Sequence, residues 1–337
     1  MNQENLDRKI RIQKIQSELR GKARISECFH YNKDECKGKI KKAHSIQRNG
    51  RLSLLEEDVN GNEMLYSFTE IESDSSGNGL FLKPIGKGIA STFMGFCDFH
   101  DSTLFSPIEN DPYEDTEEHW FLHSYRAFAI MQHRKTEQIK AFESDAEFNK
   151  IMGGIIPQSL EGTYIGFQEG EAIREKFNEI LESKDYGALD CLEIRYPDFH
   201  PIAASASMTP KYSPKTNTKL NYHTDPDIPY EFVFFNLIPD EDGSILIMSC
   251  FLDSPKSEMY INEFAELPDL IQKKVLSSIL IGEVENVFIS PFVYNKMTES
   301  EKQILIKELS GTTIYSTQYL HGHFRSELNL LDRKFVK

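Results

Sequence analysis

The segments Cys28-Phe29-His30-Tyr31-Asn32-Lys33-Asp34-Glu35-Cys36 and Gly95-Phe96-Cys97-Asp98-Phe99-His100-Asp101 decide how the first third of this chain folds. Each segment carries a pair of side chains that suit a metal ion, Cys28 with Cys36 and Cys97 with His100. Thiolate sulfur and imidazole nitrogen hold zinc in a tetrahedron, and structural zinc sites use four protein ligands. The sequence therefore predicts a structural Zn²⁺ site made of these four residues.

The two pairs differ in spacing. Cys97-x-x-His100 lets one turn present both donors to the same ion, and Gly95 frees the backbone just before it. The seven residues between Cys28 and Cys36 make a wider loop than the usual zinc knuckle. His30 and His44 are alternative fourth ligands, and reduced cysteines without a metal are the competing interpretation.

The composition indicates a soluble globular protein, with 39% hydrophobic and 27% charged residues among 337. The sequence has no apolar run long enough to cross a bilayer and no signal peptide, so we expect a cytoplasmic protein with no membrane partner. Five cysteines do not form a disulfide framework, and Cys191 and Cys250 are expected to be free within apolar strands.

Charge is distributed unevenly along the chain, whose net charge is -15. Residues 1–50 carry 13 Lys and Arg against 6 Asp and Glu, whereas the remaining residues carry 25 against 47. A basic leading segment favours DNA or RNA as a partner. Docking of that segment on the protein's own acidic surface explains the same pattern equally well. The acidic C-terminal part is a candidate surface for a protein partner.

Periodicity and turn signals predict an α+β fold. We expect a basic helix and zinc-binding unit over 1–110, a helical segment over 111–185, and a mixed or antiparallel sheet with helices over 186–337. Helices are predicted over 4–22, from 101 to 105, over 116–141, 168–184, 256–284 with a break at Pro268, and 298–309. Strands are predicted over 40–47, 64–68, 191–196, 202–207, 230–238 and 244–252.

The order of these features resembles the treble-clef zinc unit of the HNH endonuclease family. Ile40-Lys41-Lys42-Ala43-His44-Ser45-Ile46 resembles the strand that carries the family's general base, and Phe96-Cys97-Asp98-Phe99-His100-Asp101 resembles the opening of its helix, with His100 in place of a second Cys. The resemblance covers residues 25–110. The stretch from Ala90 to Glu109 also resembles a group of bacterial proteins for which no activity can be inferred.

The resemblance implies a metal-dependent nucleic-acid phosphodiesterase. His44 would be the general base, and Asp101 would hold Mg²⁺ or Mn²⁺ through oxygen. The chain departs from the family at Ala43, where a second metal ligand is common; Asp98 or Glu109 could supply an oxygen instead. Nucleic-acid phosphates would contact the basic side chains that surround this strand, namely Lys37, Lys39, Lys41, Lys42 and Arg48.

A non-catalytic interpretation keeps the zinc as a structural element and uses the basic segment to bind nucleic acid or an acidic protein. In that case His44 is a structural histidine. Two further features are left open by the sequence. The loop over 209–219 is either a binding loop or an exposed connection, and His321-Gly322-His323 is either a chelating or a plain surface turn.

Overall fold

The computed structural model describes residues 23–73, 80–144, 155–221, 228–311 and 325–337. The helix predicted over 4–22 and the turn with His321 and His323 lie outside these residues. Within the described ranges, no helix has both the length and the apolar character needed to cross a membrane.

One antiparallel sheet organises the chain and confirms the α+β class. Its strand order is β2-β3-β10-β7-β8-β9-β6. Strand β4 also pairs with β3, on the edge of β3 opposite to β10. The strands are β2 (Glu57–Val59), β3 (Asn62–Ser73), β4 (Leu80–Ile85), β6 (Leu189–Tyr196), β7 (Ile202–Met208), β8 (Val233–Asp240), β9 (Gly243–Phe251) and β10 (Val287–Ile289).

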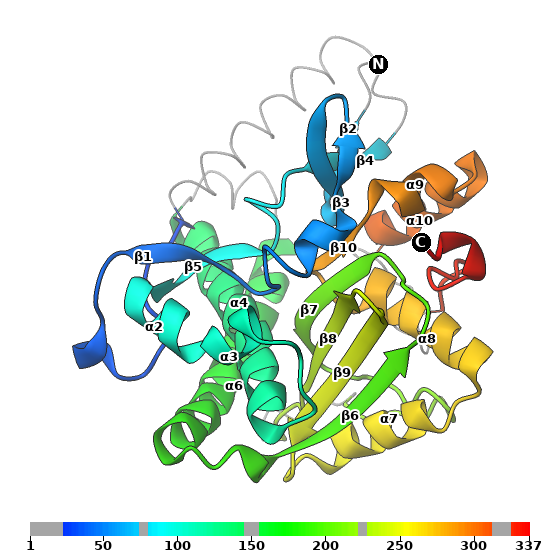
Figure 1. The fold of residues 1–337 in the computed structure, drawn as a ribbon. Coiled ribbons are helices and arrows are strands. Elements are labelled where there is room, and N and C mark those ends of the chain that lie inside the picture. Colours follow the sequence, from blue (N-terminus) through cyan, green and yellow to red (C-terminus); the bar gives the residue numbers. More distant parts are fainter. Residues whose placement is uncertain (1–22, 74–79, 145–154, 222–227, 312–324) are drawn as a thin grey trace.

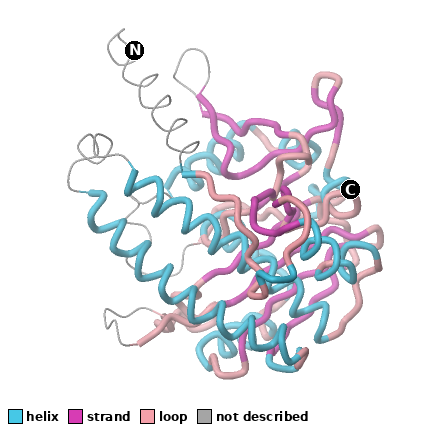
Figure 2. Tube along the Cα trace, turned by 90° about the vertical axis from the view of Figure 1, so that its left-hand side faces the viewer, coloured by secondary structure: helices cyan, strands magenta, loops and turns pink. Residues whose placement is uncertain are grey.

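Helices cover both faces of this sheet (Figure 1). The long helices α4 (Glu117–Ser144) and α6 (Ile155–Ser183) pack side by side on one face (Figure 2). The other face is covered by four helices, α7 (Pro255–Ala265), α8 (Asp269–Gly282), α9 (Pro291–Lys296) and α10 (Glu299–Gly311).

The apolar run of β8 explains this three-layer arrangement. Side chains alternate between the two faces of a strand. Phe234 therefore packs with α4 and α6, while Val233 and Phe235 pack with α7 and α8. Because the side chains on both faces of β8 are apolar, a covering layer of helices is needed on each side of the sheet.

A second, two-stranded sheet holds the candidate site. It pairs β1 (Ile40–His44) with β5 (Thr92–Cys97), and α2 (Asp98–Leu104) and α3 (Ser106–Asn110) follow directly. Between β1 and β5 the chain leaves to form β2, β3 and β4 of the large sheet. Short 3-10 turns complete the chain: η1 (Lys33–Glu35), η2 (Leu52–Leu55), η3 (Tyr186–Ala188) and η5 (Arg333–Phe335).

The segment between β1 and β5 connects the N-terminal and C-terminal parts of the chain within one sheet. Strand β3 pairs with β10, at Phe288 opposite Ser67 and Ile289 opposite Tyr66. Residues from 1–110 and from 186–337 therefore share one sheet, although the sequence assigned them to different units. Cys191 and Cys250 lie in β6 and β9 as free cysteines.

Candidate metal centre and neighbouring polar cluster

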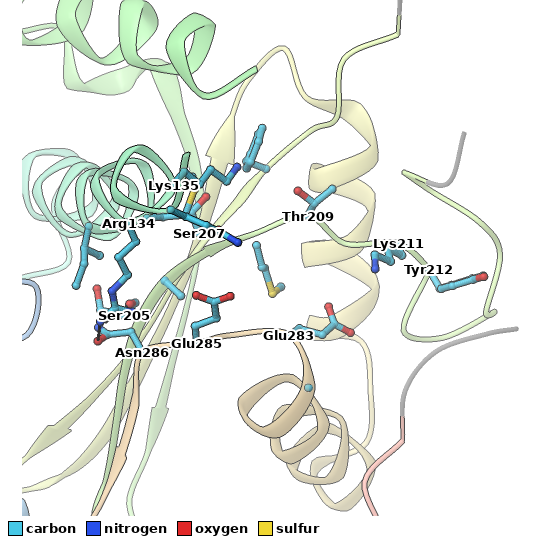
Figure 3. Close-up of a pocket in the computed structure, with 17 residues that line it drawn as sticks. Arg134, Lys135, Ser205, Ser207, Thr209, Lys211, Tyr212, Glu283, Glu285 and Asn286 are labelled. Carbon is cyan, nitrogen blue, oxygen red and sulfur yellow. Dashed lines mark hydrogen bonds between the residues drawn. The ribbon is translucent and has the colours of Figure 1, made fainter. Parts of the chain in front are cut away.

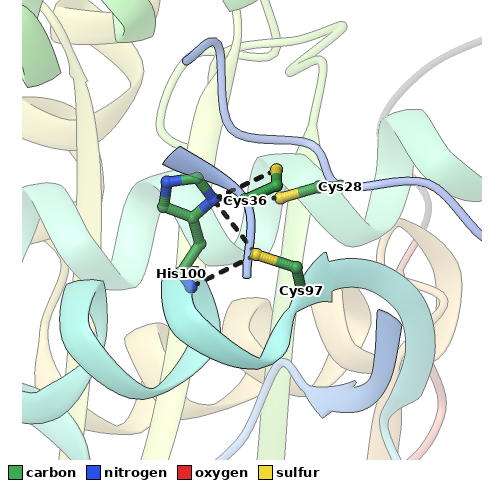
Figure 4. A group of neighbouring side chains, drawn as sticks. All are labelled: Cys28, Cys36, Cys97 and His100. Carbon is green, nitrogen blue, oxygen red and sulfur yellow. Dashed lines mark hydrogen bonds between the residues drawn. The ribbon is translucent and has the colours of Figure 1, made fainter. Parts of the chain in front are cut away.

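The structure brings the four predicted zinc ligands to one point. Their ligand atoms all lie within 4.8 Å of one another. Nδ1 of His100 faces three sulfurs, at 3.3 Å from Cys28, 3.7 Å from Cys36 and 3.3 Å from Cys97 (Figure 4). The cluster could therefore hold a metal ion.

These distances fit a tetrahedral metal site. Bonds of about 2.3 Å to sulfur and about 2.0 Å to nitrogen place neighbouring ligand atoms about 3.5–3.8 Å apart around zinc. The sulfur-to-nitrogen distances of 3.3 to 3.7 Å in the cluster are close to these edges. His30 does not join them, because its ring stacks on His100 at 3.8 Å and its Nδ1 accepts a hydrogen bond from the Asn32 amide. His44 lies in a different group of side chains, described below.

Local hydrogen bonds explain why residues so distant in sequence meet. Cys97 ends β5 and caps α2, where its sulfur accepts a hydrogen bond from the His100 amide at 3.5 Å. The Phe29 amide donates to the Gly95 carbonyl at 2.6 Å, which fixes the first pair beside β5. Gly38, at φ +78°, allows the turn after Cys36 to approach Asp98, whose Cβ would lie 2.6 Å from any added Cβ.

The electrostatics of the cluster call for a cation. Burial, followed by the neighbouring sulfurs of Cys28 and Cys97, raises the pKa of Cys36 to about 12. Burial also acts to raise the pKa of Cys97, but the amides of His100 and Lys37 outweigh it and lower the value. Three sulfurs this close ionise together only when a metal balances their charge. Glu35 lies 3.9 Å from Nε2 of His100, where carboxylates commonly orient metal-bound imidazoles.

A second polar cluster lies on the other side of the same unit and contains His44. The ring is at the end of β1, and its Nε2 is buried with no hydrogen-bond partner among the described residues. Burial lowers the pKa of His44, and Arg48 and Arg126 lower it further, while a hydrogen bond with the Lys87 main chain and the charge of Glu109 oppose the change. The imidazole is therefore neutral at pH 7, as a general base must be.

Asp101 belongs to the same cluster. Burial raises the pKa of its carboxyl, Arg126 and Lys41 lower it, and Glu109 raises it. Its Oδ1 is buried without a hydrogen-bond partner in the described parts of the chain. The charges of Glu109 and Arg126 thus act on both Asp101 and His44, which places all four in one electrostatic environment.

Glu109 and Arg126, whose charges act on both His44 and Asp101, form an ion pair with each other. Glu109, at the end of α3, accepts a hydrogen bond from Nη1 of Arg126, whose side chain is 3% exposed. The guanidinium of Arg126 lies 4.2 Å from the centre of the Phe105 ring, and its Nε has no described partner. A buried cation with an unused donor is suited to bind an anionic oxygen.

A buried hydrogen-bond network ties His44 to the large sheet. The next residue, Ser45, contacts the Ser91 hydroxyl at 2.9 Å and accepts a hydrogen bond from Nδ2 of Asn286 at 2.7 Å. Asn286 also donates to the Ser205 carbonyl on β7 at 2.9 Å. The position of the histidine therefore depends on residues from the far end of the sequence.

The predicted phosphate contacts lie at the surface around β1. All five basic side chains are exposed: Lys37, Lys39, Lys41, Lys42 and Arg48. Lys41 pairs with Asp98, and Lys37 lies 5.0 Å from the centre of the Phe99 ring. Asp98 is therefore engaged with a lysine.

Arg126 is the site residue that the sequence analysis did not identify. It lies on α4 within the stripe Phe121, Leu122, Tyr125, Phe128 and Ala129, which forms a buried aromatic and aliphatic cluster. A single arginine inside such a stripe was the available signal, because a buried guanidinium requires a partner.

Comparison with protein-family models, curated proteins and solved structures finds no match to this chain. The arrangement of its own side chains, and the resemblance carried by residues 25–110, are therefore the basis for assigning a function.

Proposed function

We propose that this chain is a metal-dependent nucleic-acid phosphodiesterase of the HNH type, in which Zn²⁺ stabilises the fold at Cys28, Cys36, Cys97 and His100. The observation that carries the proposal is the second cluster. His44 and Asp101 each have a buried polar atom with no hydrogen-bond partner among the described residues, and the charges of Glu109 and Arg126 act on both. Buried atoms that lack a partner carry a free-energy cost, which a substrate or cation would remove.

The element order supports the same assignment. A ligand loop, a strand that ends at His44, an excursion, a strand that ends at Cys97, and a helix that begins with Asp98 follow one another in the chain. This is the order that the HNH resemblance predicts. His100 and Asp101 then lie next to each other on α2, so the structural metal site and the reaction site share one short helix.

Each residue of the second cluster has a distinct role. The neutral His44 takes a proton from the attacking water at Nε2. Asp101 holds a divalent cation through carboxylate oxygen, which suits Mg²⁺ or Mn²⁺. When bound, that cation supplies polarisation of the phosphate and stabilisation of the leaving oxygen. Arg126 presents its remaining donor to a phosphate oxygen, and Glu109 fixes the position of Arg126.

The experiment has two stages. Metal analysis of the purified chain is expected to find about one zinc per chain. Supercoiled plasmid, single-stranded DNA and RNA are then incubated with Mg²⁺ or Mn²⁺, using the wild type and His44→Ala. We expect cleavage that His44→Ala slows about 100-fold or more, because a general base contributes about 10²–10⁴-fold. The zinc content and the unfolding midpoint of the variant must match the wild type.

A second candidate function is a non-catalytic zinc-stabilised module that binds nucleic acid. The five exposed basic side chains around β1 favour it, because phosphate contacts of this type need no catalytic residue. Salt-sensitive binding of DNA or RNA without His44-dependent cleavage would support this function and reject the first. Cleavage that persists in His44→Ala would place the reaction elsewhere in the chain.

A further inference from the structure

A cavity of about 340 Å³ lies beside the second half of α4, further along this helix than Arg126, and no role has been assigned to it so far. It is lined by α4, β7, the loop after β7, and the segment from Gly282 to Asn286 (Figure 3). Small-molecule sites are commonly about 300–1,000 Å³ and largely apolar, with a few convergent polar groups. The cavity has the size of such a site.

The sheet itself creates this cavity. Strand β10 pairs with β7 only along Ile202 to Ala204, and one more hydrogen bond joins the Ser205 amide to the Asn286 carbonyl at 3.3 Å. Beyond that point the segment before β10 separates from β7. The edge of β7 from Ala206 to Met208 then faces the open space, while its other edge pairs with β8.

Two cations of α4 line the cavity. Burial lowers the pKa of both Arg134 and Lys135, while Glu285 acts on both in the opposite direction. Arg134 donates to the amide oxygen of Asn286 at 3.3 Å, and Lys135 donates to the Gly166 carbonyl at 2.8 Å. Both hydrogen bonds go to neutral acceptors, and the carboxylate of Glu285, which also lines the cavity, is an anionic neighbour of both cations.

Hydroxyl groups of β7 face the same space. Ser205 and Ser207 are two residues apart and so lie on the same side of the strand. Both Oγ atoms are buried without a hydrogen-bond partner in the described residues, and Ser205 is 1% exposed. Two unused donors beside two cations favour an anionic oxygen as the missing partner.

The remaining side chains of the cavity indicate the chemical character of the part of the ligand beyond its anionic group. They combine apolar and aromatic side chains, which are Ile130, Met131, Met208, Tyr212 and Phe232, with polar and charged ones that include Gln138, Lys211 and Glu285. Glu283 also lines the cavity, and burial raises the pKa of its carboxyl to about 7, so the protonated carboxyl can donate a hydrogen bond near neutral pH. A flat body with polar edges fits between such groups.

From these contacts we propose that the cavity is a binding site for a nucleoside monophosphate or a closely similar organic phosphate. The phosphate contacts Arg134, Lys135 and the hydroxyls of Ser205 and Ser207, and the base lies among the apolar side chains. Thr209 and Lys211 belong to the loop over 209–219, which is therefore a binding loop in this proposal. The site is independent of the proposed phosphodiesterase, because it uses none of the same residues.

Calorimetry and thermal unfolding of the full chain test the proposal. The probes are AMP, GMP, CMP and UMP, with adenosine and inorganic phosphate as comparisons. At least one monophosphate should bind at least tenfold more tightly than both adenosine and inorganic phosphate and should raise the unfolding temperature. Failure of all four to bind at millimolar concentration would overturn the proposal, and so would equal affinity for inorganic phosphate.

Variants locate the binding. Arg134→Gln should weaken binding of the monophosphate at least tenfold. Ser207→Ala should weaken it severalfold without loss of stability, because the Ser207 hydroxyl has no partner among the described residues. Lys140→Gln is the matched control, since Lys140 is exposed on the same helix and does not line the cavity. Unchanged affinity in both test variants, or an equal loss in the control, would contradict the assignment.

Discussion

The Cys/His cluster and the His44 cluster lie on the same small unit, but they use their polar atoms in opposite ways. In the first, three sulfurs and one imidazole nitrogen turn toward one point and lie within 4.8 Å of one another. In the second, His44 and Asp101 have buried atoms without partners in the described parts of the chain, and the charges of the Glu109–Arg126 ion pair act on both. A closed ligand set is typical of a structural metal site, whereas unsatisfied buried groups are typical of a reaction or binding site.

The largest expected effect is the loss of a ligand from the Cys/His cluster. Cys97→Ser removes a thiolate and should abolish stable metal binding, with a loss of about 4 kcal/mol or more in the free energy of unfolding, because metal loss is among the most destabilising changes. Denaturant unfolding and metal analysis measure both quantities. Cys191→Ser is the control, since Cys191 is a free cysteine outside the cluster. A fully metallated, equally stable Cys97→Ser would remove the basis for the comparison.

In the His44 cluster, a substitution should reduce activity rather than stability. Asp101→Asn should slow metal-dependent cleavage about 100-fold or more and leave the free energy of unfolding unchanged or higher. Burial in the folded state raises the pKa of Asp101, so the carboxylate is less stable there than in the unfolded chain, and a neutral amide avoids that cost. Cleavage rates and denaturant curves provide the readout, with Asp242→Asn in an exposed turn as control. A large loss of stability would show that Asp101 is structural.

The hydrogen bonds of Asn286, which connect the His44 cluster to the large sheet, should have a smaller effect on stability. Asn286→Ala removes the hydrogen bonds that Nδ2 donates to the Ser45 hydroxyl and the Ser205 carbonyl, so the free energy of unfolding should fall by about 2 kcal/mol. Metal content should not change, because none of the four ligands is touched. Denaturant unfolding of this variant is compared with Asn295→Ala, at an exposed position of α9. Loss of metal in Asn286→Ala would mean that the two clusters are not separable.

The smallest effect at neutral pH concerns the protonation of His44. Because burial lowers its pKa, the ring stays neutral at pH 7, and the cleavage rate should fall only below about pH 6.5, by about tenfold per pH unit once the pH is below the lowered value. Glu109 raises the pKa of His44, so Glu109→Gln should move this acidic limb to lower pH. Rates measured from pH 4.5 to 8 test the direction, and a shift to higher pH would contradict it.

Much of the fold follows from local sequence patterns. The strands at β6, β7, β8 and β9 and the helix break at Pro268 agree with the predictions to within a few residues. Strand β10 was not predicted, because three residues are too few to show alternation. Helix α6 begins at Ile155, well before the predicted residue 168, and α2 begins at Asp98 because the Cys97 sulfur caps it.

By itself, the sequence determined the chemistry available at the candidate sites. It indicated Cys28, Cys36, Cys97 and His100 as candidate metal ligands, because closely spaced pairs of cysteine and histidine have few other uses in a chain without a disulfide framework. His44 and Asp101 followed from the resemblance to the HNH family. These signals are local and depend only on residue type and spacing.

Only the tertiary structure decided which of these residues work together. It brought the charges of Arg126 and Glu109 to act on His44, joined Ser45 to Asn286 across 241 residues, and opened a cavity where β10 leaves β7. Contacts of this kind depend on how whole layers pack and on whether that packing offsets the entropic cost of closing long loops. No short pattern in the sequence encodes them.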